Sequence, residues 1–460
     1  MFEKTKNIQN KYIFIAIIIV ALIFSSILSL IMYKFQQPLL IFLIIIGTTF
    51  TLLLIKYPEI TFALFLTAGV YKADLRLELI QQIIDLTIFF GFLSILGSIF
   101  NIYIRRIKFV IPTKQVLFPY FMIIILGFIS LLYTPAPLYG TDKFLRFLTI
   151  TSTALFLPFF LFQSEKAIRR FFIMFIILAI SMVIDIFSKG LKPNEISFVT
   201  AFGSNYLALG RILGIAIIIV FFYFVFSARN FFSKLTFLLL IPIFLFGVFI
   251  SGGRGPIVAL TISIFTIFLY ESFNLLKNAL VLMKIKKDNL KSLIFIWAII
   301  IIAVFLIIYF HDFFTTIFYR FKILTEGDCK SATERLMRFE KAIESLLSFP
   351  QIITGLGIGG FSVYFAGFDD IRGDYPHNIF LEVGSELGIF GLIAIIYLIF
   401  SSFLKIIYQI KNEQVNNKIF YYTLLALFIF MLINSSISGD INDNRLLFTI
   451  IGLIYATKEN

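Results

Sequence analysis

The stretch NYLALGRILGIAIIIVFFYFVF (residues 205–226) contains only one charged residue, Arg211. An apolar helix of about 20 residues is long enough to cross a bilayer. Comparable runs recur along the whole chain, which predicts an all-α integral membrane protein, a bundle of about 12 to 14 transmembrane helices. The predicted segments are 12–32, 39–55, 59–70, 79–104, 115–132, 144–162, 168–187, 205–226, 234–251, 256–276, 291–310, 379–402, 419–435 and 445–457.

The composition of the chain agrees with this class. Of the 460 residues, 60% are hydrophobic and only 14% are charged, with 61 Phe. Soluble domains carry about a quarter charged residues, so this chain has too few to cover a water-facing surface. Cys329 is the single cysteine, and His311 and His377 are the only histidines. An intramolecular disulfide and a Cys- or His-rich metal site are therefore excluded, and no cofactor is expected.

The positive charge of the chain predicts its orientation in the membrane. The formal net charge is +13, but the basic residues form short clusters between apolar runs. Positive-inside topology explains such clusters better than nucleic-acid binding. With the N-terminus in the cytoplasm, the basic loops stay inside and the loops around 135–137, 251–256 and 434–444 fall outside. The run 12–32 is interpreted as a first spanning helix, since no small-residue cleavage site follows it.

A long connection interrupts the pattern of short loops. Residues 311–376 separate the helices of 1–310 from the C-terminal helices of 377–460, and they lie on the extracytoplasmic side in this topology. Within them, residues 332–348 have the pattern of an amphipathic helix, which would lie on the membrane interface or across a cavity mouth. Residues 355–360 (GLGIGG) predict a flexible turn after this helix.

The strongest local pattern begins at His377. The sequence PHN (376–378) is followed by nine residues and then GIFG (388–391). If this segment is helical, His377 lies above a strip of glycines that admits a neighbouring helix or a lipid chain. An adjacent polar strip contains Asn378, Glu382 and Glu386, and carboxylates inside a membrane segment usually face a cavity or a cation. The alternative is an interfacial histidine beside structurally paired carboxylates.

A second pattern is SGGRGP (251–256), between two predicted helices. Pro256 suits the first position of the next helix, whose free N–H groups would favour an anion. Arg254 adds a bidentate phosphate donor, so the segment would suit a diphosphate. The alternative is a tight turn whose arginine extends to the interface.

Two weaker candidates lie on either side of this segment in sequence. Arg335 and Arg338 belong to the predicted loop helix, where a solvated face is the alternative interpretation. Asn205 and Arg211 begin the eighth predicted segment, where the arginine could extend to the interface. The sequence contains no Walker loop, dinucleotide fingerprint or metal-ligand spacing.

Residues 205–391 resemble the O-antigen ligase/O-antigen polymerase family of bacterial envelope glycosyltransferases. His377-Asn378 with Gly388-Ile-Phe-Gly391 fits the family's histidine motif, and Ser251-Gly-Gly-Arg254 falls where the family places an outer-face arginine. The segment around Arg335, followed by residues 355–361, is similar to the family's loop helix and glycine-rich turn. The first 200 residues match only in being membrane helices.

The resemblance implies a GT-C-like bundle in the bacterial inner membrane, with its active site facing the periplasm. Such enzymes move glycan from an undecaprenyl-diphosphate carrier to an acceptor hydroxyl. Ligases use lipid A-core in lipopolysaccharide biosynthesis, and polymerases use the next lipid-linked repeat unit. The chemistry needs no nucleotide, and in ligases no metal.

The resemblance also implies roles for the candidate residues. Arg254 and Arg335 would stabilise the leaving diphosphate, and His377 would accept the proton of the acceptor hydroxyl. Either glutamate could orient His377 or pair with an arginine, and the lipid tail could follow the glycine strip. The expected substrate-binding residues are Asn205, Arg211, Arg338, Asn378, Glu382, Glu386, Gly388 and Gly391. A polysaccharide or lipid transporter (a flippase) is the alternative from another class.

Overall fold

The computed structural model describes residues 38–78, 82, 84–105, 109–190, 198–227, 230–282, 308, 318–319, 322–323, 330–370, 373–412 and 415–457. The predicted helix 12–32, most of the predicted helix 291–310, and His311 and Cys329 lie outside these ranges.

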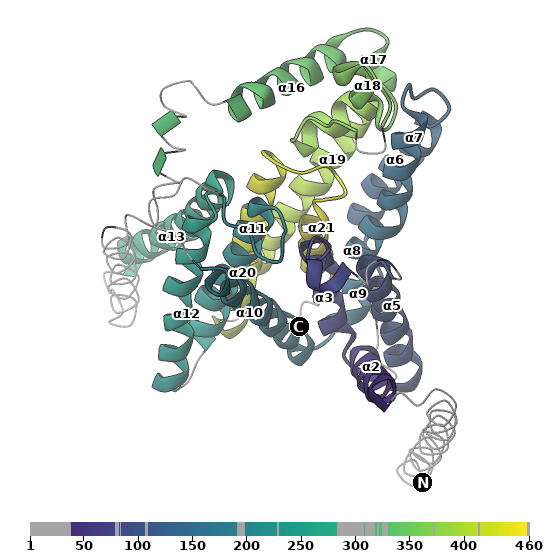
Figure 1. Cartoon of the computed structure of the whole chain (residues 1–460). Coiled ribbons are helices and arrows are strands. Elements are labelled where there is room, and N and C mark those ends of the chain that lie inside the picture. The colour runs from purple at the N-terminus through teal and green to yellow at the C-terminus, as the bar shows by residue number, and fades with distance from the viewer. Residues whose placement is uncertain are drawn as a thin grey trace, which may run out of the picture. The chain divides into compact units, whose positions relative to one another are not determined.

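Every regular element in the described ranges is helical (Figure 1). This confirms the predicted all-α class. In chain order they are α2 (Pro38–Lys56), α3 (Pro58–Tyr71), η1 (Leu75–Leu77), α5 (Leu86–Arg105), α6 (Lys114–Ser130), α7 (Pro137–Arg146), η2 (Phe147–Thr151), α8 (Ser152–Phe156), α9 (Pro158–Leu161), α10 (Glu165–Ser188), α11 (Tyr206–Ile218), η3 (Ile219–Val225), α12 (Phe231–Ile250), α13 (Arg254–Leu282), α16 (Lys330–Leu347), α17 (Gln351–Thr354), α18 (Gly360–Ala366), α19 (Ile379–Asn412), α20 (Val415–Ser435) and α21 (Arg445–Ala456).

Two compact units divide the chain, residues 1–57 and residues 58–460. The described part of the first unit is α2, an apolar helix of 19 residues. All other elements belong to the second unit.

Seven helices in the described ranges are long and apolar enough to cross a membrane. The protein is therefore a multi-pass integral membrane protein, since helices satisfy their backbone hydrogen bonds internally in lipid. The predicted total of 12 to 14 stays a prediction. The seven are Leu86–Ile104, Pro137–Leu161, Glu165–Ser188, Tyr206–Val225, Phe232–Ile250, Ile379–Asn412 and Lys418–Ser435, and shorter apolar helices are Lys114–Ser130, Arg254–Tyr270 and Arg445–Ala456.

The helix Tyr206–Val225, formed by α11 and the π-helical η3, is at the centre of the second unit. Within its most apolar window, 89% of the residues are buried inside the protein. It packs against α10, α12, α13 and α20. Gly214 allows this packing, because a Cβ there would lie 2.4 Å from the Phe430 ring of α20. Outward-facing positions instead carry exposed aromatics such as Phe92 and Phe118, which suits a lipid-facing surface.

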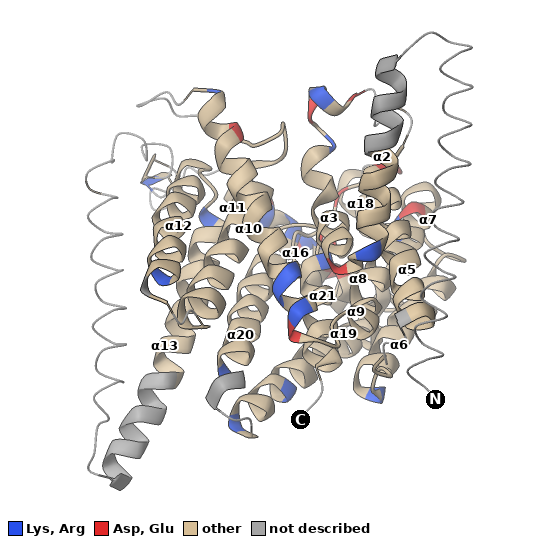
Figure 2. Cartoon of the chain, turned by 90° about the horizontal axis from the view of Figure 1, so that it is seen from below, with Lys and Arg blue, Asp and Glu red and all other residues tan. Residues whose placement is uncertain are grey.

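Charged residues are sparse on these helices, as Figure 2 shows by the mostly tan ribbon. In Figure 1, α16, α17 and α18 lie together over one end of α19. All three contact α19. On α16, Ala342 and Ser345 are buried, whereas Leu336, Ile343 and Leu347 are exposed.

The long helix α19 is broken at Gly388. This residue has φ +69° and ψ −168°, which interrupts the helical path within Ile379–Asn412. A positive φ costs glycine little, because glycine has no Cβ. The prediction of one continuous helix with aligned glycines is therefore wrong at this residue.

Candidate active site

His377 lies just before α19 rather than on it. Its backbone φ is +60°, and α19 begins at Ile379. Asn378 caps the helix, with its side-chain oxygen accepting hydrogen bonds from the N–H groups of Phe380 (2.9 Å) and Leu381 (3.1 Å). Its side-chain nitrogen donates to the carbonyl of Ser436 at 3.0 Å. The histidine is thus held at a junction between α19 and the residues that follow α20.

The half-buried imidazole of His377 is in a cationic environment. Its ring packs edge-on against Tyr375, with the centroids 4.4 Å apart. Within the described part of the chain, its buried Nδ1 has no hydrogen-bond partner. Burial, followed by the charges of Arg335, Arg338 and Arg211, lowers the pKa of His377 to about 4. The imidazole is consequently neutral near pH 7 in the absence of bound substrate.

Arg335 and Arg338 share the packed face of α16. Both are half-buried, on the side of the helix that contains buried Ala342. Arg338 donates to Asp374 at 2.9 Å, and its guanidinium lies 4.8 Å from the centre of the Phe365 ring. The charge of Arg335 acts on both His377 and Arg211. A fully solvated face, the alternative interpretation, does not describe these two arginines.

Arg211 and Arg254 lie near the starts of α11 and α13. The two helices approach closely there, because a Cβ on Gly210 would lie only 2.9 Å from the ring of Pro256. Arg254 is itself the first residue of α13. The sequence analysis predicted Pro256 as the first residue of this helix, but the helix begins two residues earlier. Asn205 caps α11 by accepting a hydrogen bond from the N–H of Leu207 at 2.8 Å.

Residues 436–444, here called the C-terminal turn, connect these elements. Ser436 accepts the hydrogen bond from Asn378. A Cβ on Gly255, next to Arg254, would lie 2.8 Å from the side chain of Ile437. A Cβ on Gly439 would lie 3.7 Å from the guanidinium of Arg211. The C-terminal turn therefore contacts the segments that contain His377, Arg254 and Arg211.

The C-terminal turn also adds two carboxylates that the sequence analysis did not select. The N–H of Asp443 donates to the side chain of Asp440 at 2.7 Å, and Asp440 is buried. Asp443 is exposed to solvent. A cluster of Asp and Asn between two apolar runs was the available signal.

Glu382 and Glu386 form ion pairs with Lys143 of α7. The Lys143 ammonium lies 2.6 Å from one oxygen of Glu382 and 2.7 Å from Glu386. All three side chains are almost completely buried, with exposures of 1% to 3%. A cavity of about 20 Å³ beside them has room for one water. These glutamates were predicted to orient His377 or to pair with an arginine. In the structure they pair with a lysine instead, and the sequence analysis did not select this lysine.

The predicted glycine strip is filled by protein. A Cβ on Gly384 would lie 3.3 Å from Leu346 of α16, and one on Gly388 would lie 2.3 Å from the carbonyl of Ile353 in α17. Gly391 faces Leu387 of its own helix at 2.5 Å. A lipid tail along this strip is therefore excluded, because α16 and α17 occupy the space beside Gly384 and Gly388.

The glycine-rich turn is tightly packed rather than flexible. Gly355, Gly357 and Gly359 all have positive φ. The N–H of Gly357 donates to the carbonyl of Glu386 at 2.9 Å, and a Cβ on Gly355 would lie 2.1 Å from the same carbonyl oxygen. This turn occupies the space beside the break in α19.

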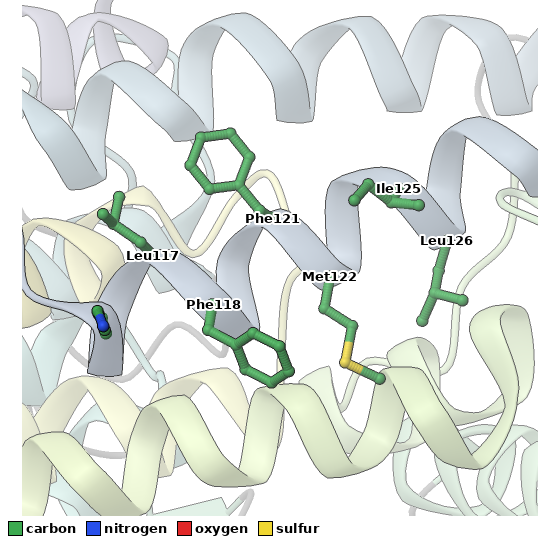
Figure 3. A pocket seen from close by; sticks show the side chains of 7 residues that line it. Leu117, Phe118, Phe121, Met122, Ile125 and Leu126 are labelled. Atoms are coloured by element: carbon green, nitrogen blue, oxygen red, sulfur yellow. The ribbon is translucent and has the colours of Figure 1, made fainter.

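An apolar groove of about 460 Å³ runs along α6 (Figure 3). Its lining residues are Lys114, Leu117, Phe118, Phe121, Met122, Ile125 and Leu126. Lys114 is the only charged member, so the groove has the character of a lipid-facing surface and not of a site for polar chemistry.

The fold and these contacts define the class of the protein: it is a multi-pass membrane protein in which a polar turn contacts the segments that contain His377, Arg211 and Arg254. Residues 239–396 match the family model of the O-antigen ligases. The match covers about a third of the chain and contains Arg254, Arg335 and His377. It confirms the predicted resemblance over this region and supports a glycosyltransferase of the O-antigen ligase/polymerase type. No curated protein matches the chain.

Proposed function

We propose that this protein transfers glycan from an undecaprenyl-diphosphate carrier to a sugar hydroxyl of lipid A-core, at the periplasmic face of the bacterial inner membrane. The observation that carries the proposal is that His377 and Arg211 both adjoin the C-terminal turn and are both affected by the charge of Arg335, within or beside the region matched by the ligase family model.

The arginines would bind the diphosphate of the donor. Arg335 and Arg211 are half-buried cations, and their mutual repulsion is relieved when an anion binds between them. Arg254 adds a guanidinium at the N-terminal end of α13, where the helix dipole favours an anion. Because a diphosphate leaving group gains negative charge as the glycosidic bond breaks, these cations would stabilise the transition state more than the ground state.

His377 would act as the base. The acceptor oxygen attacks the anomeric carbon and displaces the diphosphate, with inversion of configuration, while the hydroxyl proton passes to a ring nitrogen of His377. The neutral imidazole can accept that proton. A bound diphosphate would offset the charges of the surrounding arginines and raise the pKa of His377 towards the working pH, where proton transfer is most effective.

A reconstitution with purified donor and acceptor tests the proposal, without added nucleotide or metal. We expect Arg335→Ala and Arg254→Ala each to lower kcat by about 10² to 10³, the usual effect of losing a group that stabilises developing charge. Lys341→Ala is the matched control for Arg335, since Lys341 lies on the exposed side of the same helix and pairs with Glu344.

Each outcome of this experiment has a distinct meaning. Transfer to lipid A-core that is lost in the two arginine variants supports the ligase assignment. Lengthening of the lipid-linked chain would instead identify a polymerase. No transfer to any acceptor, with wild-type protein that binds the donor, would reject the glycosyltransferase proposal in favour of transport.

A further inference from the structure

Lys143 forms a buried ionic centre with Glu382 and Glu386, and no role in the proposed reaction accounts for it. One ammonium group contacts two carboxylates, at 2.6 Å and 2.7 Å. Burying ions is costly, and well-packed apolar residues often stabilise a fold equally well. A buried centre of this kind is best attested as a device that fixes one arrangement of segments against others.

The centre joins α7 and α19, and both helices are hydrogen-bonded to turns of the candidate active site. Glu382 accepts a hydrogen bond from the N–H of Ile441 at 3.2 Å, and the carbonyl of Lys143 accepts one from the Asn442 side chain at 3.1 Å. The C-terminal turn is thereby attached to both α7 and α19. The carbonyl of Glu386 also accepts the N–H of Gly357, which attaches the glycine-rich turn.

The break in α19 at Gly388 separates a short first half of the helix, residues 379–387, from the rest. Contacts with other segments therefore have to hold this first half in place. This short first half of α19 follows His377 directly, and Glu382 donates its N–H to the carbonyl of Asn378 at 2.9 Å. Because the rest of α19 does not extend this helix in a straight line, its direction depends on contacts with neighbouring segments, and the ionic centre is one of these contacts.

We propose that Lys143 is a positioning residue for the transfer reaction: by binding Glu382 and Glu386 it fixes the first half of α19 and the C-terminal turn, and so sets the place of His377. Lys143 does not touch the substrate in this account. The inference rests on the proposed function, and it extends that function to a residue outside the region matched by the family model.

Kinetics of Lys143→Met in the reconstituted system provide the test. A displacement of about 1 Å in a reacting group can cost on the order of 10²-fold in rate. We therefore expect kcat to fall about 10²-fold, with the KM for the lipid-linked donor little changed, because the arginines remain. Lys143→Arg keeps the charge and should restore part of kcat.

Two further variants separate positioning from stability. Arg170→Met removes the partner of Glu59, a buried carboxylate that joins α3 and α10, so it should lower the melting temperature without lowering the kcat of folded protein. The triple variant Lys143→Met/Glu382→Gln/Glu386→Gln removes the unpaired charges and should restore the melting temperature while kcat stays low. Recovery of kcat in the triple variant would overturn the proposal.

A chemical readout keeps the inference distinct from the proposed function. Modification of His377 by diethyl pyrocarbonate, followed by mass spectrometry, should be faster in Lys143→Met than in wild type and in Arg170→Met. If wild-type protein transfers no glycan, the proposed function fails, while faster labelling still supports the positioning role. Equal labelling of His377 in all three proteins would refute that role.

Discussion

The properties of His377 illustrate how neighbours set the chemistry of one residue. An isolated histidine has a pKa near 6.5, but burial and three arginines hold this one at about 4. The folded pKa is thus below the unfolded one. Between these two values the unfolded chain binds more protons, so the contribution of His377 to stability is present at neutral pH and is lost as the pH falls towards 4.

The same shift predicts the pH dependence of the proposed reaction. If neutral His377 is required, the acidic limb of kcat/KM should lie below pH 6.5, since kcat/KM reports the free enzyme. Arg335→Gln removes one of the charges that lower the pKa, so the limb should move towards higher pH. Lys341→Gln, on the exposed side of α16, should leave it in place. A limb that does not respond to Arg335→Gln would argue against His377 as the titrating base.

Candidate residues were easier to select from the sequence than the partners that they contact. The sequence selected Arg211, Arg335, Arg338 and His377, and the structure brings their charges within mutual influence. It did not select Lys143, because the predicted helix began at residue 144 and left this lysine outside the membrane. In the structure the span begins at Pro137. A contact between residues 243 positions apart, as for Lys143 and Glu386, leaves no local pattern to detect.

At the scale of elements, the break in α19 was the main departure from prediction. The alignment of glycines assumed a regular period of 3.6 residues, which holds only while φ stays negative. Gly388 and Gly355 both have positive φ, and a Cβ on Gly388 would lie 3.0 Å from the nitrogen of Gly355. The glycines therefore serve close approach between α17 and α19. Sequence alone does not show that this close approach is made at a break in the helix.

Substitution of Gly388 tests this role. Gly388→Ala adds a Cβ that would lie 2.3 Å from the Ile353 carbonyl, and both the positive φ and the collision are unfavourable. We expect a loss of about 2 to 5 kcal/mol, measured as a lower melting temperature in detergent. Gly190→Ala is the matched control, since Gly190 also has positive φ, but no atom of the described residues lies within 4 Å of the added Cβ. Equal effects of the two substitutions would mean that close packing at Gly388 contributes nothing.

At the scale of the whole molecule, composition predicted the class correctly. With 14% charged residues, the chain has no soluble alternative, and an all-helical membrane protein followed from the need to satisfy backbone hydrogen bonds in lipid. The sidedness of the helices was inferred from basic loops alone. It stays a prediction until it is measured.

Cysteine accessibility in intact cells tests that sidedness. In a Cys329→Ser background, Lys341→Cys on α16 should react with a membrane-impermeant maleimide added outside the inner membrane. Lys411→Cys, exposed in the last turn of α19, should react only after the membrane is permeabilised. The reverse pattern would invert the topology and move the candidate active site to the cytoplasm.

The ionic centre also has a consequence for biosynthesis. The helix that contains Lys143 is made long before its partners, because Glu386 follows 243 residues later. Until then the nascent chain contains Lys143 without these carboxylates, and an unpaired lysine within a membrane segment is costly. The C-terminal turn is made later still, so this site can assemble only after residue 444 has been synthesised. A chain that stops before α19 lacks both carboxylates, so the cost of this lysine should remain unrelieved.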